Sequence, residues 1–225
     1  MKAARQRWFL LGAALLSAIA GLCILLWSWP SDESRDRAVQ GMYGVGNPLF
    51  SDPAFSPHAS IGDIKQATQR AVEELVRAYP DAPDAREVLA HFEQYGNIDG
   101  DASRTREIAV QTHLGAGRCY YTHGQVEKAI EMLRKAAILD PENVPPRTEL
   151  LAIYLQNGHE REALAVCRQL CRIEPGQGDH WLKLGLLRAR LDDLEGARSA
   201  LKRALAIDPS NARYRDAAQL LEKGE

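Results

Sequence analysis

Cysteine and excess charge are both scarce in this sequence, and each shortage excludes a class of protein. The four cysteines are Cys23, Cys119, Cys167 and Cys171, with no CxxC pair among them. This number is too small for a fold built on disulfides. The 28 basic residues nearly balance the 30 acidic ones, and the formal net charge is -2. Nucleic-acid binders usually carry a basic excess, because neutralising phosphates supplies much of their affinity. No nucleic-acid partner is therefore expected.

Sequence motifs for catalysis or cofactor binding are also lacking. There is no nucleophile elbow, Walker loop or pair of catalytic carboxylates. Residues 41–46 read GMYGVG, with the glycines in the wrong order for a dinucleotide loop, and residues 97–101 resemble a calcium loop whose glycine is misplaced. The HEREA segment at His159 lacks the second histidine of a zinc-protease helix. We expect a protein that is not an enzyme and has no catalytic, cofactor-binding or metal-binding residues.

The cysteines outside the N-terminal stretch leave two alternatives open. Cys167 and Cys171 are four residues apart, on one face of a predicted helix, where buried cysteine commonly acts as a small apolar side chain. A metal pair with His159 or His180 is the alternative. In an oxidising compartment, Cys119 could instead form a disulfide with one of the two.

One long apolar run is present, at the N-terminus. It is uncharged from Trp8 to Trp27 and follows a basic flank within residues 1–7. A helix of about 20 residues rises roughly 30 Å, the thickness of the hydrocarbon core of a bilayer. The basic flank predicts a cytoplasmic N-terminus at 1–7, a transmembrane anchor at 8–29 and export of the remainder. The alternative is a signal peptide cleaved after Ala18-Ile19-Ala20, which fits a small-x-small site.

Residues 30–60 are rich in Gly, Pro, Ser and Asp and show no sustained apolar period. Such a composition buries too little apolar surface to offset the entropy lost on ordering. We predict a flexible linker at 30–60, with Tyr43, Phe50 and Phe55 as possible points of contact.

The rest of the chain is dominated by an internal repeat of 34 residues. Three sets of residues recur at this interval or at twice this interval: Pro141, Pro175 and Pro209; Ala129, Ala163 and Ala197; and Gly117 with Gly185. Each period holds two stretches with apolar residues at i, i+3 and i+4, which predicts a pair of antiparallel helices. Each proline should end the second helix of its pair. A single pair cannot bury its own apolar face, so neighbouring pairs must stack.

This period and these residue types resemble the tetratricopeptide repeat. Three windows fit the family pattern, at 110–143, 144–177 and 178–211, with Trp181 and Gly185 the clearest matches in the third. The main departures from the pattern are His113 and Arg147 in place of Trp, Leu151 in place of Gly, Leu170 in place of Ala, and Arg188 in place of Tyr. The resemblance implies an all-α fold in which helix pairs stack as an α-solenoid.

Helical periodicity extends beyond these windows on both sides. Residues 61–109 are predicted to hold a degenerate helix pair at 61–78 and 84–95, and residues 212–225 a C-terminal capping helix. Tyr214 should face inward in that last helix.

The resemblance also implies that the first helix of each repeat lines a concave face that binds a ligand. Carried onto this sequence, the predicted partner-binding groove consists of Gln111, Leu114, Arg118, Tyr121, Thr148, Leu155, Gln156, Leu182, Leu186 and Arg190. Arg118 stands where chaperone-binding relatives have Asn, so their carboxylate clamp is not expected. A mainly apolar groove with arginines near its ends suits an amphipathic helix or an extended peptide. The alternative is that Leu182 and Leu186 pack against the C-terminal helix.

Together these patterns predict a non-catalytic scaffold or adaptor tethered to a bacterial inner membrane. The bilayer would hold residues 8–29, the repeats would lie in the periplasm, and the partner would be a protein. The alternative function is a permanently bound accessory or assembly subunit of a membrane enzyme or secretion complex.

Overall fold

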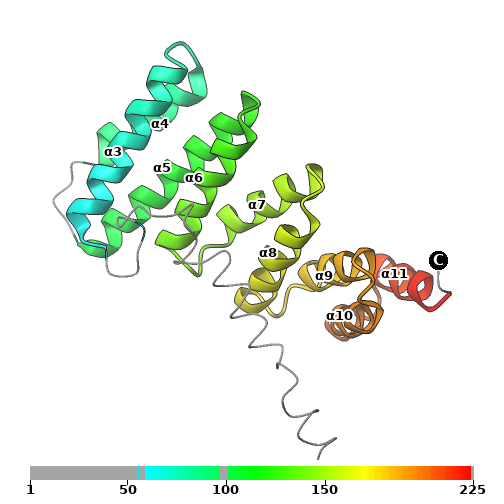
Figure 1. The fold of residues 1–225 in the computed structure, drawn as a ribbon. Coiled ribbons are helices and arrows are strands. Elements are labelled where there is room, and N and C mark those ends of the chain that lie inside the picture. The colour runs from blue at the N-terminus through cyan, green and yellow to red at the C-terminus, as the bar shows by residue number, and fades with distance from the viewer. Residues whose placement is uncertain (1–54, 56–58, 97–100, 224–225) are drawn as a thin grey trace, which may run out of the picture. The chain divides into compact units, whose positions relative to one another are not determined.

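The computed structural model describes residue 55 and residues 59–96 and 101–223 of the chain (Figure 1). The predicted N-terminal segment at 1–7, the anchor at 8–29 and most of the predicted linker lie outside these residues. Among the helices that are described, none is both long and apolar enough to cross a membrane.

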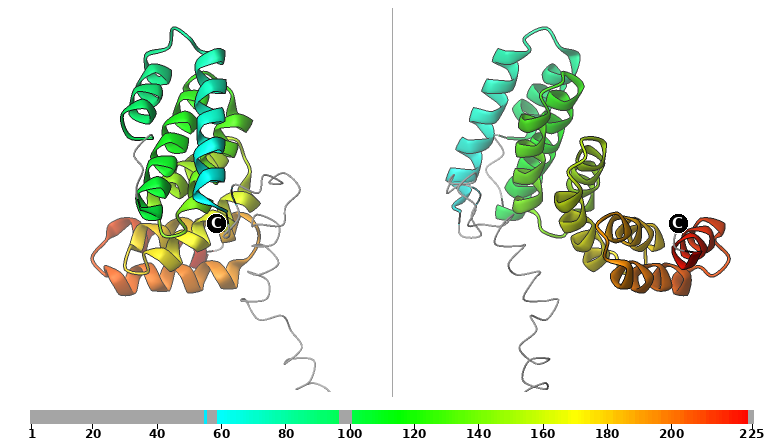
Figure 2. Two further views of the ribbon diagram at one scale, coloured as in Figure 1. Left: turned by 90° about the vertical axis from the view of Figure 1, so that its left-hand side faces the viewer. Right: turned by 45° about the vertical axis from the view of Figure 1, so that its right-hand side comes forward.

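Every secondary-structure element longer than a single turn in the described ranges is an α-helix. In chain order the helices are α3 (Ile61–Ala78), α4 (Pro83–Tyr95), α5 (Ala102–Thr122), α6 (Val126–Leu139), α7 (Val144–Gln156), α8 (Glu160–Ile173), α9 (Gly178–Arg190), α10 (Leu194–Ile207) and α11 (Ala212–Lys223). The two helices of each predicted repeat pack against one another, and the second helix also contacts the first helix of the next pair (Figures 1 and 2). This part of the chain is an all-α solenoid.

The turn within each repeat uses the same backbone geometry at positions one period apart. Gly124 and Gly158 have φ values of +76° and +72°, and the equivalent residue of the third repeat is Asp192 with φ 61°. This left-handed region is favourable for glycine and costs a residue with a side chain about 1 kcal/mol or more. The third turn therefore keeps the geometry of the first two at a cost in backbone strain.

The prolines end the second helices as the sequence predicts. The helices α6, α8 and α10 end at Leu139, Ile173 and Ile207, two residues before the proline in each case. Glycine allows the helices of a pair to approach closely. A Cβ atom at Gly117 would lie 2.8 Å from Cγ of Leu133, and one at Gly185 would lie 2.8 Å from Cγ of Leu201.

The helices before the first repeat pack against it, since α3 and α4 both contact α5. Ser60 and Asp63 form a capping box that starts α3.

The helix α5 begins before the first predicted repeat. It starts at Ala102 and not at residue 110, and Asp101 accepts a hydrogen bond there from the Ser103 backbone N–H. The reason is that no proline or glycine interrupts the helix before Gly115. The predicted boundary at 109/110 therefore falls inside a continuous helix.

Within the predicted linker, Phe55 is one of the predicted points of contact, and its side chain is only 4% exposed. It packs in a cluster with residues of α3, α5 and α6. Its ring lies edge-on to the His113 ring at a centroid distance of 5.2 Å, and the Lys135 ammonium is 5.1 Å from its centroid. Burial of one aromatic ring is enough to fix one point of a polar segment.

Candidate interaction surface

The first helices of neighbouring repeats are joined by side chains from the predicted groove. Arg118 on α5 forms a salt bridge with Glu149 on α7, with an Nη2–Oε1 distance of 2.5 Å and an Nε–Oε1 distance of 2.7 Å. One turn later on α5, the Tyr121 hydroxyl donates a hydrogen bond to the side-chain oxygen of Gln156. The structure therefore brings Arg118, Tyr121 and Gln156 together on one face.

This row of contacts continues into the third repeat. Gln156 ends α7, and Glu160 begins α8 just beyond the turn. Glu160 forms a salt bridge with Arg190 at the end of α9. Leu186 lies one turn before Arg190 and is 46% exposed. Arg190 of α9 therefore links the third repeat to the start of α8 in the second, and Leu186 adds an exposed apolar group on α9.

The other predicted groove residues lie in different surroundings. Thr148 is exposed on α7, where its hydroxyl donates to the Val144 carbonyl at 3.2 Å. Leu155 is half-buried against the core. Gln111 is exposed but borders a separate cleft of about 610 Å³ between α4 and α5, whose other lining residues are His91, Tyr95, Asp101, Ser103, Arg104, Glu107 and Ile108.

Leu114 and Leu182 do not belong to an open groove, since they are only 4% and 3% exposed. Leu114 is buried because α3 and α4 pack against α5. Leu182 is buried in a cluster with Tyr214 of α11. The alternative prediction therefore holds for Leu182, which packs against the C-terminal helix, but not for Leu186.

These placements change the expected character of the surface. Because Leu114 and Leu182 are buried, the exposed residues of the predicted groove are polar except for Leu186. Arg118 and Arg190 are paired with glutamates, so they do not form two free positive ends. We refer to Arg118, Tyr121, Thr148, Gln156, Leu186 and Arg190 as the repeat face.

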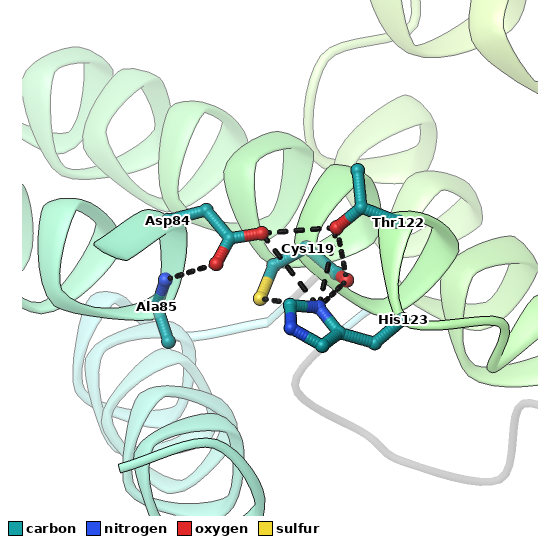
Figure 3. Close-up of polar contacts among 5 residues, drawn as sticks. All are labelled: Asp84, Ala85, Cys119, Thr122 and His123. Carbon is teal, nitrogen blue, oxygen red and sulfur yellow. Dashed lines mark hydrogen bonds and ion pairs between the residues drawn. The ribbon is translucent and has the colours of Figure 1, made fainter. Parts of the chain in front are cut away.

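A second polar cluster lies at the junction of α4 and α5 (Figure 3). Asp84 comes from the first turn of α4, and Cys119 and His123 come from the end of α5. Nδ1 of His123 is 3.7 Å from Oδ2 of Asp84 and 3.8 Å from Sγ of Cys119. The pattern predictions missed this cluster. The Cys119–His123 spacing of four residues was a signal in the sequence, but the contact with Asp84 depends on the packing of α4.

Hydrogen bonding and burial set the protonation of this cluster. Burial opposes ionisation of the Asp84 carboxyl, but hydrogen bonds, chiefly with Thr122, lower its pKa overall. Burial raises the pKa of the Cys119 thiol to about 12, and Asp84 adds to the effect. Nδ1 of His123 lies 2.8 Å from the Cys119 carbonyl, which can only accept a hydrogen bond. That nitrogen therefore carries a proton in this arrangement.

Cys167 and Cys171 are buried on α8, and both are free thiols, as is Cys119. The Cys167 thiol donates to the His180 carbonyl at 3.3 Å. Nε2 of His180 is 2.8 Å from a carboxylate oxygen of Glu174. The structure thus places these two cysteines in the core between repeats.

Family models for the tetratricopeptide repeat match residues 110–143 and 150–222. Among curated proteins, the mouse FK506-binding protein-like (Mus musculus) is 37% identical over 101 residues, covering 43% of this chain and 26% of that protein. The Arabidopsis thaliana protein CTR9 homolog is 28% identical over 111 residues, covering 49% of this chain and 10% of that protein. The chain therefore spans about a tenth to a quarter of the length of these relatives.

Two solved structures are also similar to this chain. A crystal structure of MamA is 21% identical with a TM-score of 0.47, covering 72% of this chain and 79% of that one. The first tetratricopeptide domain of Spaghetti (RPAP3), bound to an HSP90 peptide, is 20% identical with a TM-score of 0.44. The match covers 51% of this chain and 91% of that one. From the family models and the stacked helix pairs, we conclude that residues 110–143 and 150–222 carry tetratricopeptide repeats in an all-α solenoid.

Proposed function

We propose that this chain is a non-catalytic, membrane-tethered scaffold that binds a peptide or helix of a partner protein on the repeat face. The observation that carries the proposal is the set of side-chain contacts that link neighbouring repeats. Arg118–Glu149 and Tyr121–Gln156 connect α5 to α7, and Arg190 connects α9 to Glu160 at the start of α8.

Preorganisation of these side chains favours binding. Long polar side chains lose about 0.5–1.5 kcal/mol of rotamer freedom each when a partner immobilises them. Here Arg118, Tyr121 and Arg190 are already held by neighbours, so part of that cost is met in the free protein. Tyr and Arg are also enriched among the residues that dominate binding energy at protein interfaces.

Leu186 supplies the apolar contact that an amphipathic helix or extended segment needs. It is the most exposed leucine among the predicted groove residues, because α11 covers Leu182 but leaves the next turn of α9 open. The polar surroundings of Leu186 favour a partner with one apolar residue flanked by hydrogen-bonding groups.

Capture of partners after crosslinking in the cell tests the repeat face. The full chain with Leu186→Asp should lose the captured protein. The matched control is Leu194→Asp, because Leu194 is also a leucine at 46% exposure but lies at the start of α10. Both variants should fold, since both side chains are exposed.

Equal capture by the wild type and by Leu186→Asp would refute the repeat face as the binding site. A stoichiometric complex that survives gentle detergent extraction, unaffected by Leu186→Asp, would instead favour the accessory-subunit function.

The tethering part of the proposal is supported by the apolar run at 8–29, the basic flank before it and the polar segment after it. In this arrangement the N-terminus is cytoplasmic, and the repeats lie in the periplasm of a bacterium. A topology reporter fused after residue 60 is expected to be active only on the exported side. Cytoplasmic activity of the reporter would refute this orientation.

A further inference from the structure

We propose that Asp84, Cys119 and His123, the α4–α5 triad, form a binding site for a borderline divalent transition-metal ion such as Zn²⁺. The triad shares none of its side chains with the repeat face, and the inference does not rest on the proposed scaffold function. It combines one carboxylate, one thiol and one imidazole from two helices (Figure 3).

Two of the three distances among the ligand atoms are within about half an ångström of those in a tetrahedral zinc site. Zinc lies about 2.3 Å from sulfur and about 2.0–2.2 Å from nitrogen or oxygen, so neighbouring ligand atoms are roughly 3.3–3.5 Å apart. In the triad, Nδ1 of His123 is 3.8 Å from Sγ of Cys119 and 3.7 Å from Oδ2 of Asp84. All three atoms lie within 4.8 Å of one another. Small side-chain shifts would complete the geometry.

The composition of the triad selects the class of metal. Thiolate and imidazole ligands suit zinc and similar ions, whereas calcium and magnesium require several oxygen ligands. Binding would release the thiol proton of Cys119 to solvent and move the ring proton of His123 from Nδ1 to Nε2, which leaves the Nδ1 lone pair for the metal. The Asp84 and His123 side chains are 39% and 33% exposed, which gives the ion a route in and leaves a fourth position for water.

Neighbouring groups already orient two of the ligands, as outer residues do in protein metal sites. The Ala85 backbone N–H lies 3.1 Å from Oδ1 of Asp84, and the Thr122 hydroxyl lies 2.9 Å from Oδ2. The Tyr79 ring packs on the His123 ring at a centroid distance of 4.2 Å. The carboxylate and imidazole are therefore held facing one another without a metal.

A purely structural role does not require these residue types. The second repeat has Ile153 and Asn157 at the positions of Cys119 and His123. Asn157 donates to the Ile153 carbonyl at 2.8 Å, the same contact and distance that His123 makes with the Cys119 carbonyl. An amide thus caps the end of the first helix as well as an imidazole does. In the first repeat the metal-ligating pair occurs where Asp84 faces it.

Titration of the metal-free full chain with Co²⁺ tests the site, because a cobalt–thiolate bond gives a charge-transfer absorption band. The wild type should show the band, and added Zn²⁺ should abolish it. Cys119→Ser should lack the band. His123→Asn should weaken Co²⁺ binding by at least about tenfold while keeping the far-ultraviolet circular dichroism of the wild type, since Asn157 fills the same role in the next repeat. His159→Asn, the same substitution at an exposed histidine, should bind like the wild type.

Absence of the band from the wild type would overturn the proposal. A band that survives in Cys119→Ser would also overturn it, because it would arise from other thiols. Equal binding by folded His123→Asn and wild type would remove the imidazole from the site and refute the triad.

Discussion

Replacing Arg147 with methionine should destabilise the junction between the first two repeats. Arg147 is only 6% exposed, although it stands at a position where the repeat pattern has Trp. Its guanidinium donates to the Asn143, Ala137 and Asp140 carbonyls at 2.8, 3.0 and 3.3 Å, and to the Gln169 side chain at 3.1 Å. It thereby bonds carbonyls at the end of α6 and in the turn that leads to α7, and so ties the first repeat to the second.

The expected magnitude is a balance of two effects. A hydrogen bond from a charged group contributes about 1.5–3 kcal/mol, so the two shortest bonds contribute about 3–6 kcal/mol. Burial lowers the pKa of the Arg147 guanidinium, which shows that desolvation of the cation opposes these bonds. Methionine keeps the apolar stem and removes both the bonds and the desolvation cost. We expect a net loss of about 2 kcal/mol, or about 4–8 °C in Tm for a domain of this size.

Chemical denaturation of the full chain, followed by far-ultraviolet circular dichroism, measures this loss. Arg198→Met is the matched control, because that side chain is 48% exposed and pairs only with a largely exposed Glu195. The control should change the free energy of unfolding by less than about 0.5 kcal/mol. If Arg147→Met is as stable as the control, the carbonyl bonds do not outweigh desolvation, and the reasoning is wrong.

Three further substitutions or treatments test other features. Asp192→Gly should stabilise the third repeat by about 0.5–1 kcal/mol in the same denaturation assay, because it relieves the left-handed strain at φ 61°; an unchanged or lower stability would contradict this. Phe55→Ala should cost about 3 kcal/mol, since it empties a buried site; no change would mean that residue 55 belongs to a free linker. In a Cys23→Ser background, the native chain should react slowly with a thiol reagent at about pH 8 and rapidly once unfolded. A pKa of about 12 keeps the Cys119 thiol protonated at about pH 8. The pKa of the Cys167 thiol is also raised, by hydrogen bonding to Cys171 and by burial. Fast reaction of the native chain would contradict their burial.

The sequence by itself determined the repeat period, the helix pairs and the ends of the second helices. These features depend on local physics: the spacing of apolar residues along one helix, and the inability of proline to continue one. The predicted anchor at 8–29 also rests on a local pattern, and it stays a prediction.

Only the tertiary structure decided which side chains are available. The first-helix positions of the repeat are equivalent in sequence, yet Leu182 is covered by α11 while Leu186 is open, and Leu114 is covered by helices before the first repeat. Pairing of Arg118 with Glu149, the docking of Phe55 and the meeting of Asp84 with Cys119 join residues at least 31 positions apart in the chain. Periodicity describes one helix at a time, whereas burial and pairing depend on which other helices pack against it.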